Sequence, residues 1–263
     1  MTSQFELPKD VMLDTNAMVY LYLYVDTCDE IGIDLDQNSF VDFTNILDER
    51  LKKPANQKVL QIRMLKKGYN VYKSLNKLKN SDSTFYFSKL AKLELNHVCL
   101  ENKYHQELSE CNIPYRIRQK DPFKYDIPPA YLTEIYTTGV INHVKRMEEL
   151  LSDKGVEFNL VDEDPTVMGQ TIDIITTIFN QYIHLQSNDL YIYCLAVQTM
   201  STYFLLFDGE LKNVAEKLRT DDYYREYREK IIDDLCRCRR LDKFNFDEEG
   251  KHNVIFPEAV NTI

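Results

Sequence analysis

Four short, continuously apolar segments, separated by longer helical stretches, constrain the fold of this chain more than any other feature. They cover residues 11–13, 84–87, 156–161 and 203–207. A half-exposed strand alternates apolar and polar residues, whereas a continuous apolar run is typical of a parallel strand that is buried on both faces. Helices must then cover both faces of the sheet. The sequence therefore predicts an α/β protein with three layers, in which helices flank a short central parallel sheet of four or five strands.

The stretches between these segments have helical patterns. Pro165 stands where a first-turn proline is favoured, and the chain has only 7 glycines, which is typical of many helices and few tight turns. We expect helices over residues 16–25, 40–53, 56–79, 89–110, 130–154, 166–183, 189–200 and 210–219. We predict one domain over 1–220, with helical insertions at about 40–80 and 111–154, and then a charged C-terminal helix and tail over 221–263.

Composition excludes several classes of protein. There is no apolar run long enough to span a membrane, and the N-terminal sequence lacks the pattern of a secretory signal, so we expect a cytoplasmic protein without a membrane partner. The 6 cysteines and 5 histidines lack the spacing of a zinc site. The net charge of −10 argues against a sequence-blind coat on nucleic acid.

Carboxylates follow the apolar segments at places where a parallel sheet binds ligands. Asp14 directly follows the first segment and Asp208 the last, Asp189 opens a buried helix, and Glu94 lies about two helical turns after the second segment. Ligands of open parallel sheets bind beyond the carboxyl ends of the strands. Carboxylates that meet there repel each other unless a cation lies between them. Oxygen ligands select Mg²⁺ or Mn²⁺, which assist phosphodiester hydrolysis.

Each of these four residues also has a purely structural interpretation. Asp14 and Asp189 stand where a helix N-cap is wanted, and Asp208 precedes a glycine, as a turn residue would. Glu94 could be an ordinary solvent-facing helix residue. The joint pattern favours a site, because all four residues could converge on one edge of the sheet.

Four motifs in order resemble those of the PIN-domain family of metal-dependent nucleases. They are V-M-L-D-T-N at 11–16, S-K-L-A-K-L-E-L at 88–95, N-D-L-Y-I-Y-C-L-A at 188–196 and F-L-L-F-D-G-E at 204–210. The resemblance implies a pocket of Asp14, Glu94, Asp189 and Asp208 that is catalytic and binds Mg²⁺ or Mn²⁺. It also implies cleavage of single-stranded RNA. Asn16 would orient Asp14 or a water, and Glu210 would support the site.

The sequence departs from the family pattern near its last aspartate. The usual hydroxyl residue is replaced by Leu206 and Phe207, and Glu210 replaces a second aspartate. The alternative is therefore a catalytically weakened PIN-fold scaffold that binds RNA or protein. A phosphatase of the haloacid-dehalogenase type fits less well, because it needs an aspartate where Asn16 stands. The resemblance leaves open a protein inhibitor or antitoxin-like partner, and a homodimer.

One stretch of the chain is strongly basic. Residues 50–80 carry ten basic and no acidic side chains, so the rest of the chain must sum to −20 to give the total of −10. Tyr69 and Tyr72 lie in this stretch and could stack on bases. The alternative is a solvated helix face that pairs with acidic segments elsewhere. We predict RNA binding by the following residues: Lys52, Lys53, Lys58, Arg63, Lys66, Lys67 and Lys73.

Overall fold

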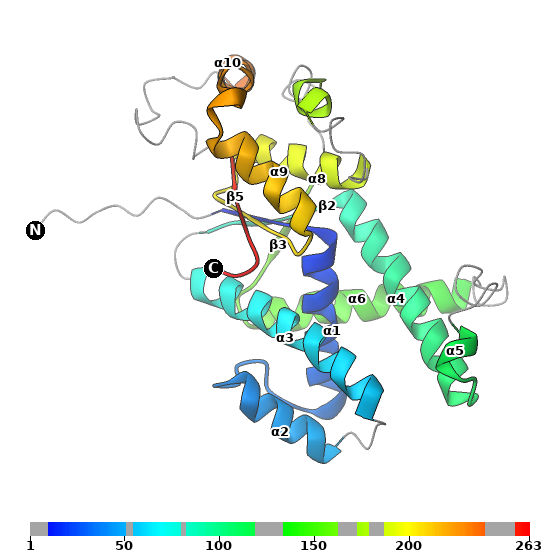
Figure 1. Ribbon diagram of the computed structural model, residues 1–263. Helices are drawn as coiled ribbons and strands as arrows, with labels where there is room; N and C mark the ends of the chain where they lie inside the picture. Colours follow the sequence, from blue (N-terminus) through cyan, green and yellow to red (C-terminus); the bar gives the residue numbers. More distant parts are fainter. Residues whose placement is uncertain are drawn as a thin grey trace, which may run out of the picture.

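A parallel sheet of five strands forms the centre of the part of the chain that the computed structural model describes, namely residues 10–50, 55–79, 83–118, 134–162, 173–178, 187–239 and 256–263 (Figure 1). The strands are β1 (Val11–Leu13), β2 (Phe85–Ser88), β3 (Phe158–Val161), β4 (Tyr203–Leu205) and β5 (Glu258–Val260). Their order across the sheet is β3-β2-β1-β4-β5, and each neighbouring pair is parallel. The predicted α/β class with a central parallel sheet is confirmed.

The central strand β1 is buried on both faces, as its apolar run predicts. Met12 pairs with Tyr86 of β2 on one side and with Phe204 of β4 on the other, and its side chain is fully buried. The prediction was wrong for β3, which lies at the edge of the sheet and leaves Leu160 45% exposed. An edge strand is covered on fewer sides than a central one, and the apolar letters alone do not distinguish the two.

The fifth strand comes from the end of the chain. In β5, the Glu258 N–H donates to the Thr202 carbonyl, and the Leu206 N–H donates to the Val260 carbonyl, so the chain end is built into the sheet beside β4. The charged segment before it contains helix α10 (Arg225–Arg239). The sequence predicts a helix and a tail here, and its local pattern does not predict the strand β5. The predicted domain division near residue 220 stays a prediction.

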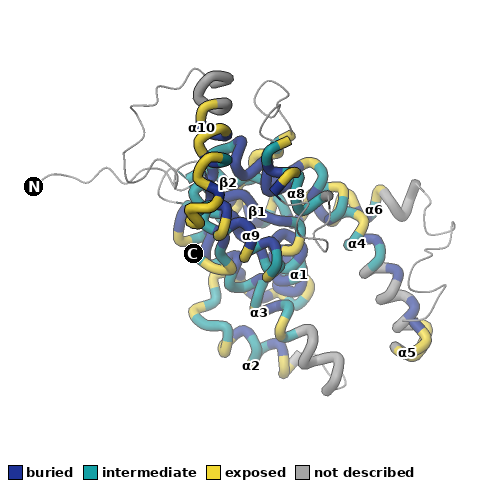
Figure 2. The backbone as a smooth tube through the Cα atoms, turned by 45° about the horizontal axis from the view of Figure 1, so that its top comes forward, coloured by how far each residue is buried: buried dark blue, intermediate teal, exposed yellow. Residues whose placement is uncertain are grey.

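Helices cover the sheet on both sides. Figure 1 shows α8 (Ser187–Gln198), α9 (Gly209–Thr220) and α10 on one side of the sheet, and α1 (Thr15–Ile31) and α3 (Ala55–Leu78) on the other. The further helices include α2 (Phe40–Arg50), α4 (Lys89–Glu110), α5 (Tyr115–Arg118), α6 (Glu134–Asp153) and the 3₁₀ turn η2 (Asp222–Tyr224), and residues 173–178 are also helical. Because α1 packs against α3, α4 and α6, it is apolar on nearly all sides, and Figure 2 shows it among the buried segments.

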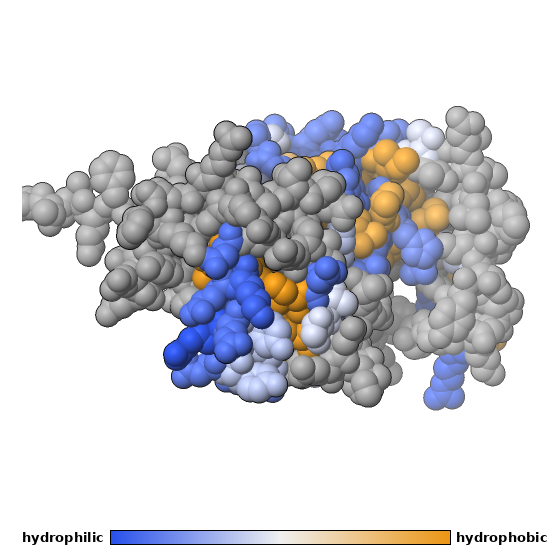
Figure 3. Space-filling view, turned by 90° about the horizontal axis from the view of Figure 1, so that it is seen from above, coloured by the Kyte–Doolittle hydropathy of each residue, from blue (hydrophilic) through white to orange (hydrophobic). Residues whose placement is uncertain are grey.

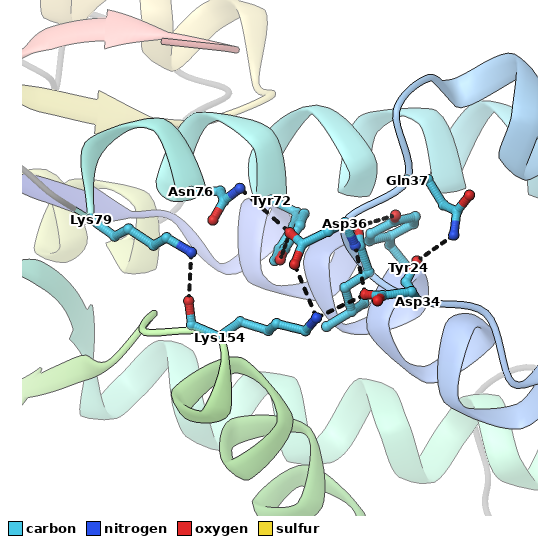
Figure 4. A network of polar contacts seen from close by, with 9 residues as sticks. Tyr24, Asp34, Asp36, Gln37, Tyr72, Asn76, Lys79 and Lys154 are labelled. Carbon is cyan, nitrogen blue, oxygen red and sulfur yellow. Dashed lines mark hydrogen bonds and ion pairs between the residues drawn. The ribbon is translucent and has the colours of Figure 1, made fainter.

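The described parts of the two predicted insertions contain helices, and a polar network connects these parts (Figure 4). The Lys154 ammonium donates to Asp34 at 2.8 Å and to Asp36 at 3.0 Å, while the Tyr72 hydroxyl donates to Asp36 at 2.6 Å. The Tyr72 hydrogen bond, followed by that of Lys154, holds the pKa of the Asp36 carboxyl below its usual range. Lys79 donates to the Lys154 carbonyl at 2.8 Å. The loop after α1 is thus tied to both α3 and the end of α6.

Among the described residues seen from above, apolar side chains form limited patches between hydrophilic ones (Figure 3). Large apolar side chains on the surface include Leu93 of α4 and Tyr223. Within the described residues, no helix has both the length and the apolar composition needed to cross a membrane.

Candidate functional site

Asp14 lies at the carboxyl end of the central strand and is almost fully buried. Its backbone N–H donates to the Leu205 carbonyl of β4 at 3.0 Å, which continues the sheet by one residue. Its side chain caps α1 by accepting a hydrogen bond from the Asn16 N–H at 3.3 Å. Only 2% of Asp14 is exposed to solvent. The capping interpretation of this residue is therefore correct, but a cap carboxylate that is buried to this degree is unusual.

The surroundings of Asp14 disfavour its charged form. Burial, followed by the negative charge of Asp189, raises the pKa of Asp14 to about 6 from an ordinary value of 3.8, and the charge of Glu94 adds to the rise. Hydrogen bonds from the Thr15 and Asn16 backbone oppose the rise but do not cancel it. Asp14 therefore lies within electrostatic range of carboxylates from two other helices, α4 and α8.

Glu94 is held by two polar side chains from other helices. Ser88 caps the helix that carries it, because the Ser88 hydroxyl accepts a hydrogen bond from the Ala91 N–H at 2.8 Å. The Thr15 hydroxyl donates to Glu94 Oε2 at 2.5 Å, and the Asn188 amide donates to Glu94 Oε1. Both carboxylate oxygens are thus oriented by α1 and α8, and each keeps a lone pair for a further ligand. Glu94 is not the ordinary solvent-facing residue of the structural alternative.

Thr15 and Asn188 were not among the predicted site residues. Both belong to the quoted motifs, directly after Asp14 and directly before Asp189, so the motifs themselves contained a signal. What could not be read from the sequence is that these two side chains converge on one glutamate. Thr15 is 79 positions and Asn188 94 positions from Glu94 along the chain.

The other predicted residues lie at the same end of the sheet. Asp189 is in the first turn of α8, next to Asn188. Asp208 caps α9 by accepting a hydrogen bond from the Leu211 N–H at 2.7 Å. It follows the end of β4 by three residues, and the Leu205 carbonyl of β4 accepts the hydrogen bond from the Asp14 backbone. Glu210 lies in the first turn of α9, and Asn16 is exposed.

The carboxylates do not form a compact ligand group. Among the described residues, no three Asp, Glu, His or Cys side chains close into a metal-ligand group. Asp14 nevertheless lies near enough to Asp189 and Glu94 for their charges to raise its pKa. The donors are all oxygen, which suits Mg²⁺ or Mn²⁺ and not zinc.

The described part of the basic stretch has an unpaired face. Arg63 and Lys66 are exposed, and Lys67 and Lys73 are partly exposed. Among the described residues, none of these four forms an ion pair, whereas the lysines and arginines outside α3 that do so include Lys89, Lys92, Arg146, Lys154, Arg219 and Arg225. This result favours a free cationic face over one that pairs with acidic segments. Lys52, Lys53 and the Lys58 side chain lie outside the described residues.

Tyr72 does not face solvent, contrary to the suggestion that it stacks on bases. Its side chain is fully buried and its hydroxyl is bound to Asp36. Tyr69 is half-buried and packs edge to face against Tyr24 of α1, with 5.7 Å between the ring centroids. These two tyrosines pack against Tyr24 of α1 and so belong to the interface between α1 and α3.

A hollow of about 220 Å³ lies elsewhere, between α4, α6 and β3. Lys92 and Glu148 line it and form an ion pair of 2.6 Å with each other. The pair satisfies both charges, so the hollow carries no chemistry comparable to that of the carboxylates.

Comparisons with known protein families, with curated proteins and with solved structures found no match. Inferences about function therefore rest on the side-chain geometry. The structure brings Asp14, Glu94 and Asp189 into one environment, and it places Asp208 beyond the neighbouring strand.

Proposed function

We propose that this protein is a metal-dependent endoribonuclease of the PIN type, which hydrolyses phosphodiester bonds of single-stranded RNA. The observation that carries the proposal is the buried Asp14, whose pKa is raised to about 6 by burial and by the charges of Asp189 and Glu94. Strongly perturbed carboxyl groups cluster at functional sites. An ordinary helix cap gains nothing from two further carboxylates beside it.

In this proposal Asp14, Glu94, Asp189 and Asp208 hold Mg²⁺ or Mn²⁺. When bound, the cation supplies a Lewis acid that neutralises charge developing on the phosphate. Thr15 and Asn188 orient the Glu94 carboxylate toward it. The Asp14 carboxyl must be ionised to act as a ligand, so the site is expected to work best above about pH 6. The basic face of α3 attracts the RNA, whose phosphates the carboxylates would otherwise repel.

A second candidate is a PIN-fold scaffold that binds RNA or protein without turnover. The observation that favours it is the absence of a hydroxyl beside Asp208. Leu206 is fully buried there, and the ring of Phe207 packs against Tyr20. Such a scaffold would bind RNA with no dependence on a divalent cation.

We place the proposed activity in the cytoplasm. Cys28, Cys99 and Cys194 are free thiols buried in the core. Burial raises the pKa of each of these thiols to about 12, so they are inert packing groups. Free structural thiols of this kind are usual in a reducing compartment.

The test is cleavage of an unstructured RNA with Mn²⁺ or Mg²⁺, compared between wild type, Asp14→Asn and Asp208→Asn. Both substitutions keep the size and capping ability of the residue, and we expect each to lower the rate by about 100-fold or more. Asp222→Asn is the matched control, since it removes a carboxylate that is 82% exposed. Equal cleavage by all four proteins would exclude the assigned site. RNA binding without cleavage by wild type would favour the scaffold.

A further inference from the structure

A lysine and two aromatic rings from three separate elements meet beside the carboxylates. The rings of Tyr20 and Phe207 pack edge to face, with centroids 5.0 Å apart. The Lys67 Nζ lies 4.5 Å from the centroid of the Tyr20 ring and 5.1 Å from that of Phe207, and it donates to the Tyr20 hydroxyl at 3.2 Å. Lys67 belongs to α3, Tyr20 to α1, and Phe207 to the segment between β4 and α9.

Two residues of this cluster are close in sequence to carboxylates of the candidate site. Phe207 is bonded to Asp208, and Tyr20 lies on the helix that Asp14 caps. Through its contacts with Tyr20 and Phe207, Lys67 connects the basic face of α3 to the segment that carries Asp208.

All three side chains remain partly exposed to solvent. An ammonium group has three N–H donors, of which Lys67 gives one to Tyr20. Within the described part of the chain, no carboxylate pairs with Lys67, in contrast to Lys92 with Glu148 and Lys154 with Asp34. Two donors are thus available for an anionic ligand, next to aromatic surface that is not fully covered.

The cluster is also held in place by a close contact between its two helices. A Cβ atom at Gly68 would lie 2.0 Å from the Tyr20 carbonyl oxygen, so α1 and α3 touch backbone to backbone at the residue that follows Lys67. A subsite whose parts are fixed beforehand loses little entropy when a ligand binds.

We propose that Tyr20, Lys67 and Phe207 form a nucleotide subsite, which binds an unpaired nucleotide of single-stranded RNA beside the carboxylates. An exposed aromatic face stacks on the base, and the Lys67 ammonium contacts the adjoining phosphate. Stacking tolerates any base sequence, and a lysine offsets the repulsion between phosphate and carboxylates. The inference rests on the proposed function for its ligand.

The experiment measures binding of a labelled, short oligouridine strand by fluorescence anisotropy, in EDTA so that no cleavage occurs. We compare wild type with Lys67→Met, which keeps the aliphatic chain, and with Phe207→Leu. We expect Phe207→Leu to weaken binding about tenfold. Lys67→Met is expected to weaken binding severalfold and to reduce the slope of log affinity against log salt by about 0.7. Lys67→Arg should restore most of the affinity.

Lys230→Met is the matched control, because Lys230 also lies over a ring, 5.8 Å from the centroid of Tyr227 in α10. The Lys230→Met variant should bind the oligouridine with wild-type affinity. Thermal melts of all variants report folding, and Lys67→Met should melt close to wild type. Wild-type affinity in both Lys67→Met and Phe207→Leu would overturn the subsite, as would absence of binding by wild type. If wild type binds a duplex of the same length as tightly as the single strand, the proposal that an aromatic ring stacks on an unpaired base is wrong.

The outcome separates the subsite from the proposed function. If wild type cleaves RNA but Lys67→Met and Phe207→Leu bind as wild type does, the subsite is wrong and the nuclease stands. If both variants lose binding and wild type cleaves nothing with Mn²⁺ or Mg²⁺, the subsite stands and the nuclease does not.

Discussion

Asp14→Asn should make the protein more stable, by about 3 kcal/mol near neutral pH when no divalent cation is present. The expected gain follows from the pKa of Asp14, which is raised from 3.8 to about 6, because each pKa unit corresponds to about 1.4 kcal/mol. Asparagine keeps the N-cap hydrogen bond and carries no charge for Asp189 and Glu94 to repel. For a chain of this size the melting temperature should rise by about 6–12 °C.

The gain in stability from Asp14→Asn should increase with pH. A carboxyl whose pKa is raised by folding costs no stability below its unfolded pKa of 3.8, and its full cost appears once the pH exceeds about 6. The advantage of Asp14→Asn should therefore be about 3 kcal/mol at about pH 7.5 and less than about 1 kcal/mol at about pH 4.

Denaturant unfolding in EDTA at both pH values measures the difference. Asp222→Asn is again the control, and it should give no gain, because the pKa of Asp222 is lowered by its hydrogen bond from Arg225. If Asp14→Asn is no more stable than wild type at the higher pH, the ionised Asp14 carboxylate does not lower the stability of the folded state, and the prediction is wrong.

Gly68→Ala should destabilise the protein by about 3 kcal/mol or more, the upper end of the cost of overpacking. The added Cβ would meet the Tyr20 carbonyl oxygen at 2.0 Å and the Tyr24 Cβ at 2.7 Å. Neither atom can rotate away, so α1 and α3 would have to separate along the interface that carries Tyr24 and Tyr72. The free energy of unfolding, measured with denaturant, should fall accordingly.

Gly209→Ala is the matched control for this substitution. No atom lies within 4 Å of a Cβ at Gly209, which begins α9. Alanine favours a helix more than glycine does, so this variant should be unchanged or slightly more stable. Equal stability of Gly68→Ala and wild type would contradict the close contact of α1 with α3, and with it the fixed position of Lys67.

Local patterns predicted most elements of the fold. Helix α4 begins and ends at the predicted residues, and β1 has the same bounds as the first apolar segment. The strand β5 escaped detection because it has only three residues and includes a glutamate, so it has no measurable period. Whether a strand is central or at an edge, as with β3, depends on neighbours that a local pattern does not contain.

The candidate site was predictable in its carboxylates but not in their surroundings. Strand ends and helix starts are local features, and they indicated that Asp14, Asp189 and Asp208 lie beyond strand ends or in the first turn of a helix, as they do in the structure. The hydrogen bonds from Thr15 and Asn188 to Glu94, and the meeting of Lys67 with Phe207, depend on contacts between distant parts of the chain. Tyr72 was suggested to stack on bases but is buried, because basic neighbours in the sequence do not indicate which face of a helix is buried.

The most direct test of the central claim is a titration with Mn²⁺, monitored by the melting temperature of wild type and of Asp14→Asn. Binding to the folded state raises the melting temperature as the cation concentration exceeds its dissociation constant. We expect a clear rise for wild type at about pH 7.5 and a weaker one at about pH 5, where a proton occupies Asp14. Asp14→Asn should start higher and respond little. A wild-type melting temperature that Mn²⁺ does not change, or an equal rise in the two proteins, would contradict a divalent-cation site at Asp14.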